Sequence, residues 1–268
     1  MKRSFPVLLI ASLFFFSFLI IFMLQHYPSS TTALKVGVTA GPHADIVKKI
    51  SDIAKKEDLQ IEVIEFNDFI LPNEALNAGD LDLNSFQHEQ YLNEQVRSRG
   101  YKLKVIAKTV VMPLGIYSTK LKSLDDLPKG AKIIIPNDPT NGGRALKLLA
   151  KHGVISVKDD TNPSILDITS NPKNLSFVEI EAALIPRSLA DPDIDAAITN
   201  TDWILQSGRD PKSALVHEDK DSPYVNVIVA RTGDEAKADI LKFVKFYHSQ
   251  EIRDFIDSTY KGAVIPAW

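Results

Sequence analysis

The sequence contains no cysteine. Disulfide bonds, thiol enzymes and lipid attachment through an N-terminal cysteine are therefore excluded for this sequence. The chain also has no stripe of basic residues with interleaved aromatics. Its 31 basic side chains are outnumbered by 34 acidic ones, which gives a net charge of −3. This balance argues against nucleic acid as a partner.

Several motifs of catalysis and cofactor binding are missing as well. A G-x-S-x-G nucleophile elbow does not occur. Gly142-Gly143 is not followed by the lysine of a phosphate-binding loop, and the glycine spacing early in the chain is wrong for a dinucleotide fingerprint. His88-Glu89 begins like a zinc-binding H-E-x-x-H pattern, but the fifth residue is Leu92. We therefore predict no catalytic residue, no cofactor and no metal.

The N-terminal segment, residues 1–33, differs chemically from the rest of the chain. Lys2 and Arg3 precede an uncharged run over residues 4–24 that is rich in Leu, Ile and Phe. At about 1.5 Å per residue, such a helix just spans a hydrocarbon core of about 30 Å, so an uncleaved membrane anchor is one interpretation. A signal peptide cleaved after Ala33 is the other. Both place the remaining chain in the periplasm or at the outer face of the inner membrane.

Strand and helix patterns alternate in the remaining chain, which predicts an α/β fold with mostly parallel sheets and helices on both faces. Strands are expected over residues 34–39, 61–66, 81–85, 132–136, 176–180, 194–199 and 221–231. Helices are expected over residues 44–56, 74–78, 89–99, 144–152 and 236–260.

The pattern starts again after about residue 120, which predicts two α/β lobes that enclose a cleft. Lobe 1 would comprise residues 34–117 and 225–268, and lobe 2 residues 118–224. We expect the chain to pass from lobe 1 to lobe 2 at residues 121–128 and to return at residues 221–231.

Polar and aromatic side chains gather where the predicted strands end. Residues 66–91 carry Phe69, Phe86, His88 and Tyr91. Open α/β sheets bind ligands at strand ends, so this cluster predicts the wall of a small-molecule pocket. Ordinary surface turns are the competing interpretation. No nucleophile arrangement surrounds His88, so a polar neighbour of the ligand is preferred to a catalytic base.

A second polar cluster, residues 137–143 followed by Arg144, lies at a predicted turn from strand to helix. The free N–H groups of a helix N-terminus and a guanidinium fork both stabilise an anion such as a carboxylate. In the competing interpretation, Asn141 caps the helix and Arg144 forms a surface ion pair. Asn200 and Asn226 can each accept a hydrogen bond from an ammonium group, while a turn-capping role for Asn200 stays open.

Six segments of the chain resemble a known family. They read F-N-D-F-I-L-P-N-E-A-L, S-F-Q-H-E-Q-Y-L, I-P-N-D-P-T-N-G-G-R-A-L, L-I-P-R-S-L, I-T-N-T-D and E-D-K-D-S-P-Y-V-N-V-I-V. They look like the methionine-binding substrate-binding proteins of ABC importers, the methionine-uptake lipoprotein family. The similarity covers about residues 34–268.

The resemblance implies a type II periplasmic-binding-protein fold, in which two lobes joined by two crossover strands close on a ligand. The implied ligand is free L- or D-methionine, and the implied partners are an ABC permease and its ATPase. Methionine derivatives, methionine-containing dipeptides, and an enzyme on a similar scaffold with His88 as its base are the alternatives that we keep.

For the ligand's side chain, the resemblance implies an aromatic wall of Phe69, Phe86 and Tyr91, with His88 beside the thioether. Sulfur is polarizable and makes favourable contacts with aromatic rings, which is consistent with this arrangement. Position 69 is often tyrosine in the family. The phenylalanine here removes one hydroxyl, which can change the preference among methionine and its derivatives.

For the ligand's charged groups, the resemblance implies that Arg144 and Asn141 hold the α-carboxylate and that Asn200 and Asn226 face the amino group. Family members usually carry a lipidated cysteine after the signal peptide, and this sequence has none. Any anchoring would therefore depend on the apolar run at residues 4–24.

Overall fold

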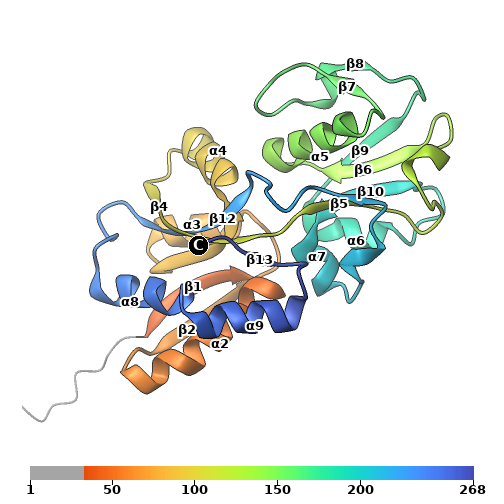
Figure 1. Cartoon of the computed structure of the whole chain (residues 1–268). Helices are drawn as coiled ribbons and strands as arrows, with labels where there is room; N and C mark the ends of the chain where they lie inside the picture. The colour runs from red at the N-terminus through yellow and green to blue at the C-terminus, as the bar shows by residue number, and fades with distance from the viewer. Residues whose placement is uncertain (1–32) are drawn as a thin grey trace, which may run out of the picture. The chain divides into compact units, whose positions relative to one another are not determined.

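Two β-sheets organise residues 33–268, which are the part of the chain that the computed structural model describes (Figure 1). The expected leader, residues 1–33, lies outside this range apart from Ala33. Among the helices of the described residues, none is both long enough and apolar enough to cross a membrane.

The first sheet has six strands in the order β13-β4-β12-β3-β1-β2. Its strands are β1 (Leu34–Thr39), β2 (Ile61–Phe66), β3 (Leu83–His88), β4 (Leu103–Val111), β12 (Val225–Arg231) and β13 (Ile265–Pro266). β1 runs parallel to β2 and β3, as the alternating pattern predicted. β12, β4 and β13 are then added by antiparallel pairing, so this sheet is mixed and less parallel than expected.

The second sheet has five strands in the order β11-β5-β10-β6-β9. Its strands are β5 (Leu114–Tyr117), β6 (Lys132–Pro136), β9 (Ser176–Ile180), β10 (Ala196–Asn200) and β11 (Val216–His217). β6 is parallel to β9 and β10, whereas β5 and β11 pair antiparallel. A separate antiparallel pair joins β7 (Ser156–Val157) to β8 (Ile168–Ser170).

Helices cover both faces of each sheet (Figure 1). On the first sheet, α2 (Pro42–Ala54), α8 (Ala238–Tyr247) and α9 (Gln250–Tyr260) share one core cluster, while α3 (Leu71–Ala78) and α4 (Glu89–Arg99) cover the other face. On the second sheet, α5 (Pro139–Lys151) packs on one face, and α6 (Ile185–Ser188) and α7 (Thr201–Gln206) pack on the other.

The first βα unit shows why these residues form these elements. β1 is almost continuously buried, as is typical of a strand that is covered on both faces. Gly41 then adopts a positive φ of 92°, which glycine allows without strain, and Pro42 begins α2 at a position where no backbone N–H is required. Within α2, Ile46 and Ile50 are four residues apart and both are fully buried against the sheet.

The chain passes between the two sheets twice. The first connection is Met112-Pro113, between β4 and β5, and the second connection is residues 218–224, between β11 and β12. Our prediction of a first passage at residues 121–128 was wrong, because β5 already pairs with β10 in the second sheet. β4 ends at Val111 and β5 begins at Leu114. Pro113 separates the two strands, because proline has no backbone N–H for a ladder hydrogen bond. We keep the division into two lobes as a proposal, with the first boundary moved before Leu114.

Other predicted elements also have different bounds. α2, α3, β10 and β12 each begin or end a few residues away from the prediction. Two larger differences have a clear cause. The helix expected over residues 236–260 is two helices, because Ser249 interrupts it and its hydroxyl accepts a hydrogen bond from the backbone N–H of Ile252 (3.3 Å) at the start of α9. The strand expected over residues 81–85 is β3, which begins two residues later and runs to His88. The end of this strand was predicted too early because Gln87 and His88 are polar and do not continue the apolar strand pattern.

Candidate functional site

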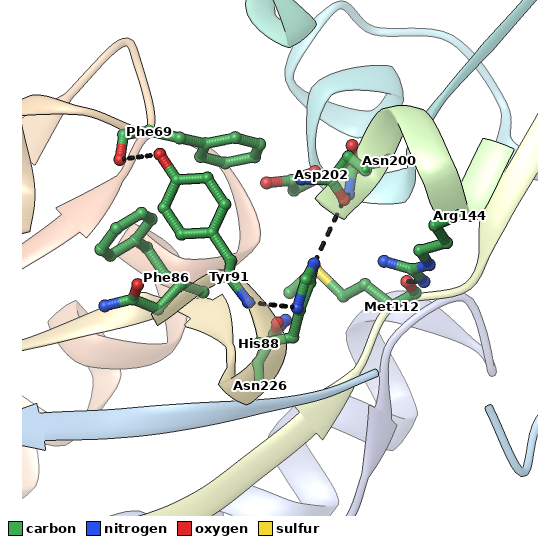
Figure 2. Close-up of a pocket in the computed structure, with 11 residues that line it drawn as sticks. Phe69, Phe86, His88, Tyr91, Met112, Arg144, Asn200, Asp202 and Asn226 are labelled. Atoms are coloured by element: carbon green, nitrogen blue, oxygen red, sulfur yellow. Dashed lines mark hydrogen bonds between the residues drawn. The ribbon is translucent and has the colours of Figure 1, made fainter. Parts of the chain in front are cut away.

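A cavity lies between the two sheets (Figure 2). The eight predicted ligand-binding residues all line it: Phe69, Phe86, His88, Tyr91, Asn141, Arg144, Asn200 and Asn226. Three further residues that the sequence did not single out complete the lining: Gln87, Met112 and Asp202. The structure therefore brings both predicted clusters to one cavity, and the roles of their members stay predictions.

A bulge interrupts β3 beside the cavity. The pairing of β12 with β3 runs from Gln87 directly to Ser85, so Phe86 is the extra residue of a β-bulge. A bulge bends its strand and changes the direction of the side chains around it. Three consecutive residues of this segment line the cavity: Phe86, Gln87 and His88.

Three buried amides lock α3 onto β3 behind the aromatic wall. The Asn73 side chain donates to Gln87 Oε1 (2.7 Å), and Gln87 Nε2 donates to Asn73 Oδ1 (2.6 Å) and to Asn84 Oδ1 (3.1 Å). Buried polar groups that are mutually satisfied in this way rigidify their surroundings. The wall therefore rests on a fixed support.

A fourth aromatic ring, that of Trp203, packs against the aromatic wall without lining the cavity itself. The Phe69 ring centroid lies 5.9 Å from those of Phe86 and Tyr91, and 5.1 Å from the Trp203 ring on α7. The Tyr91 hydroxyl donates to the Phe69 backbone carbonyl (2.8 Å), which fixes the loop that carries Phe69. Trp203 is contributed by the second-sheet side, and only its position after the I-T-N-T-D motif could have indicated it.

His88 is held in one tautomer by its neighbours. Its Nδ1 accepts a hydrogen bond from the Tyr91 backbone N–H (3.1 Å), so the ring proton is on Nε2, which donates to Asn141 Oδ1 (3.3 Å). Burial, assisted by the nearby positive charge of Arg144, lowers the pKa of His88 to about 3. The imidazole is therefore a neutral donor that also caps α4.

The helix after the second polar cluster begins earlier than predicted. α5 starts at Pro139 rather than at Arg144, and Asp138 caps it by accepting from the Asn141 backbone N–H (2.9 Å). The competing interpretation, in which Asn141 caps the helix, was therefore wrong. Gly142 had suggested a loop, but a Cβ at this position would lie 2.8 Å from a carbonyl oxygen of β6, so close packing of α5 on the sheet requires glycine.

Asn141 instead links three parts of the site. Its side-chain Nδ2 donates to Asp138 Oδ2 (3.0 Å). Its Oδ1 accepts from both His88 Nε2 and Asn200 Nδ2, the latter at 3.0 Å. Because His88 belongs to the first sheet and Asn200 to the second, this amide joins the two sides of the cavity.

Arg144 is buried, with 3% of its surface exposed, so the surface ion pair considered for it was wrong. Its guanidinium forms a two-pronged ion pair with Glu218, in which Nε donates to Oε1 at 2.7 Å and Nη2 donates to Oε2. Nη2 also donates to the Met112 carbonyl (3.1 Å), and the guanidinium lies 4.3 Å from the Tyr224 ring centroid. It therefore contacts both connections between the sheets, and within residues 33–268 its Nη1 has no hydrogen-bond partner.

Three further polar side chains line the cavity: Asn200, Asn226 and Asp202. Asn200 Oδ1 is buried and has no hydrogen-bond partner among the described residues. The Asn226 side-chain amide lies 3.5 Å from His43 Nε2. Asp202 is buried, and this burial raises the pKa of its carboxyl to about 7. Over residues 33–268, no group of three or more His, Asp or Glu side chains is placed to hold a metal ion.

Comparisons with known proteins cover the same residues. The family model described as NlpA lipoprotein matches residues 34–268. The D-methionine-binding lipoprotein MetQ of Salmonella typhi is 46% identical over 239 residues, which is 88% of each chain. Lipoprotein 28 of Escherichia coli K12 is 40% identical over 244 residues, or 90% of each chain.

Solved structures give the same result. A nutrient binding protein from Burkholderia cenocepacia, solved bound to methionine, has 44% identity and a TM-score of 0.85, with 88% of this chain and 100% of that chain covered. An ABC transporter periplasmic substrate-binding protein from Coxiella burnetii has 39% identity and a TM-score of 0.83, with 87% and 100% covered. The matched region contains both sheets and the whole cavity.

Proposed function

The chain belongs to the NlpA lipoprotein family, and on that premise we propose that it is a substrate-binding protein that captures methionine and delivers it to an ABC importer. The resemblance that its motifs indicated is thus confirmed at the level of the family, and so is the two-lobed fold class of periplasmic binding proteins. The family consists of binding proteins and not enzymes. One observation carries the proposal: the same cavity is lined by an aromatic wall, by a basic side chain, Arg144, and by an acidic one, Asp202.

The aromatic wall suits the methionine side chain. A thioether is apolar and polarizable, and each contact between sulfur and an aromatic ring contributes about 0.3–1.5 kcal/mol. Phe69, Phe86 and Tyr91 all line the cavity and pack against one another, with ring centroids about 6 Å apart, so they can offer such contacts together. His88 is a neutral donor at the edge of this wall and requires no charged ligand group.

The other side of the cavity suits an α-amino acid. Among the described residues, neither Arg144 Nη1 nor Asn200 Oδ1 has a hydrogen-bond partner. Nη1 can donate to a carboxylate, and Oδ1 can accept from an ammonium group, assisted by Asn226. Asn141 already uses its side chain on Asp138, His88 and Asn200. We therefore propose that Asn141 positions its neighbours instead of holding the carboxylate itself.

We further propose that the binding domain works on the outer side of the cytoplasmic membrane, together with a permease and its ATPase. Residues 1–33 would direct its export and either anchor the protein or be removed. N-terminal sequencing of the exported protein tests this point. Leu34 as the first residue would indicate cleavage after Ala33, and an intact N-terminus would indicate the anchor.

A thermal-shift screen against the amino acids tests the binding function. A ligand at about 100 times its Kd stabilises the folded state by about 2.7 kcal/mol, so methionine should raise the Tm by several degrees. Calorimetry then gives the affinity, and chromatography should recover the methionine unchanged. No shift with methionine, or its consumption by the purified protein, would contradict the proposal.

A further inference from the structure

One carboxylate that lines the cavity is buried and lies outside the ion pairs of the described residues. Asp202 has 3% of its surface exposed, and within residues 33–268 it takes part in no ion pair. Its Oδ1 accepts from the Trp203 backbone N–H (2.9 Å), while its Oδ2 makes no hydrogen bond to another described residue. The guanidinium in the same cavity, that of Arg144, is already paired with Glu218.

A second unsatisfied acceptor lies two residues away. Asn200 donates its side-chain N–H to Asn141 Oδ1 (3.0 Å), and since an amide oxygen only accepts, this contact fixes which way the Asn200 amide points. Its own Oδ1 is buried and has no hydrogen-bond partner within residues 33–268. Figure 2 shows the Asp202 and Asn200 side chains next to each other at the cavity. Two acceptor atoms, Asp202 Oδ2 and Asn200 Oδ1, therefore line one part of the cavity, and neither accepts a hydrogen bond from another of the described residues.

Buried acceptors of this kind are costly unless a donor satisfies them. An ammonium group has three N–H donors and a positive charge, so it can satisfy the carboxylate and the amide oxygen together. A hydroxyl or a water molecule would supply a donor but no charge. The chemistry of this corner thus matches a primary ammonium group better than a neutral ligand group.

We propose that Asp202 is the residue that selects for a free ammonium group on the ligand, and that binding of this group converts protonated Asp202 to the carboxylate and releases its proton to solvent. This inference rests on the proposed function and deepens it. In the unliganded protein, burial holds the pKa of Asp202 at about 7, so a fraction of the molecules carries the proton at neutral pH. The ammonium stabilises the charged form, and this coupling makes the affinity fall as the pH drops below about 7.

The other titratable groups around the cavity do not produce this pH dependence. Burial lowers the pKa of both His88 and His43, on β3 and α2, to about 3, and burial raises the pKa of Tyr91 on α4. The charged groups on the second-sheet side have partners within the protein: Glu218 forms an ion pair with Arg144, and Asp138 caps α5.

The test compares methionine with the analogue that lacks only its amino group, using calorimetry on the full chain in detergent after bound ligand has been removed. The isosteric variant Asp202→Asn keeps an acceptor for the Trp203 N–H. It should lower the methionine affinity by more than about tenfold and change the affinity for the analogue by less than about twofold. Asp210→Asn, an exposed aspartate that caps a short helical turn, is the matched control and should change neither affinity.

Proton release is measured in the same experiment by repeating the titration at about pH 7 in buffers of different ionisation enthalpy. Wild type should release a fraction of a proton when it binds methionine and none when it binds the analogue, and Asp202→Asn should release none with either ligand. Equal losses for both ligands in Asp202→Asn, or unchanged proton release, would overturn the role of Asp202 while leaving methionine binding intact. Failure of the wild type to bind methionine would overturn the proposed function and this inference with it.

Discussion

Replacement of Arg144 tests two roles that the structure gives to one side chain. Its ion pair with Glu218 is buried, with side-chain exposures of 2% and 11%. Removing one partner of a buried pair leaves an uncompensated charge, which typically costs about 3–5 kcal/mol. Glu218 Oε2 still accepts from the Leu114 backbone N–H (3.0 Å) and the Ser222 hydroxyl (3.2 Å). We therefore expect Arg144→Ala to lose about 3 kcal/mol of unfolding free energy, the lower end of that range.

The same substitution should weaken methionine binding by more than about tenfold, or about 1.4 kcal/mol, because the carboxylate loses its cation. Glu218→Gln is the matched variant. It keeps an oxygen that can accept from Arg144 Nε and leaves the guanidinium charge without a competing anion, so methionine should bind as tightly as to wild type or more tightly. Urea unfolding followed by circular dichroism gives the stabilities, and calorimetry at a temperature where all variants are folded gives the affinities.

Two results would refute this reasoning. Wild-type affinity in Arg144→Ala would show that the guanidinium does not hold the ligand carboxylate. An equal loss of affinity in Arg144→Ala and Glu218→Gln would show that Arg144 acts only by fastening the two connections through Met112 and Glu218.

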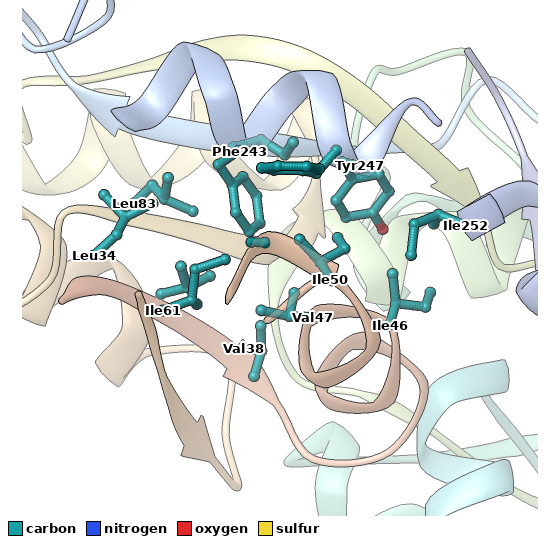
Figure 3. Packing of buried hydrophobic residues seen from close by; sticks show 14 of the residues in the cluster. Leu34, Val38, Ile46, Val47, Ile50, Ile61, Leu83, Phe243, Tyr247 and Ile252 are labelled. Carbon is teal, nitrogen blue, oxygen red and sulfur yellow. The ribbon is translucent and has the colours of Figure 1, made fainter. Parts of the chain in front are cut away.

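Three further predictions follow from the packing and the buried titratable groups. Phe243 is fully buried in the first-sheet core (Figure 3), so Phe243→Ala should lower the unfolding free energy by about 3–5 kcal/mol in urea titrations and leave the methionine affinity unchanged while the protein is folded. Tyr91→Phe removes one hydroxyl hydrogen bond within the aromatic wall, so it should cost about 0.5–1.5 kcal/mol in the same titration and speed up methionine release in stopped-flow measurements. His43 and His88 each have a pKa near 3 in the folded protein against 6.5 in the unfolded chain, so their contribution to stability is complete above pH 6.5 and is lost as the pH falls toward 3. Asp202 acts in the opposite direction, since its raised pKa favours the folded state at low pH and this gain is lost as the pH rises through about 7; Asp202→Asn should therefore steepen the acid-induced fall of the urea midpoint.

The parts of the fold that follow from local pattern were predictable from the sequence. β1, β2, β6, β9 and α4 have the predicted bounds, because each is a periodic or apolar run that a turn or capping residue limits on both sides. The passage at Pro113 was missed because the sequence pattern of an apolar extended segment is the same whether the segment stays in one sheet or enters another. The split between α8 and α9 was missed because one capping serine scarcely alters a helical period.

Prediction of the site had a similar limit. The lining residues could be named because strand ends converge in an open α/β sheet, so polar residues at several such ends share one cavity. Their partners could not be named, because pairing depends on three-dimensional contacts. Arg144 and Glu218 are 74 residues apart, and the sequence around neither residue predicts their ion pair. Asp202 was visible in the I-T-N-T-D motif, but its importance comes from burial without a cation, which the sequence does not show.

These unequal pairings give the cavity an asymmetry that can be measured. The cation Arg144 already has an anionic partner in Glu218, whereas the anion Asp202 has no cationic partner among the described residues. A ligand carboxylate therefore binds Arg144, whose charge Glu218 already largely compensates, whereas a ligand ammonium group binds Asp202, which forms no ion pair with a described residue. The interaction of the ammonium group with Asp202 should therefore contribute more to the binding free energy. We expect the methionine analogue without its amino group to bind more weakly than the analogue without its carboxyl group. Calorimetric titration of wild type with both analogues decides the order, and the reverse order would contradict this account of the charges.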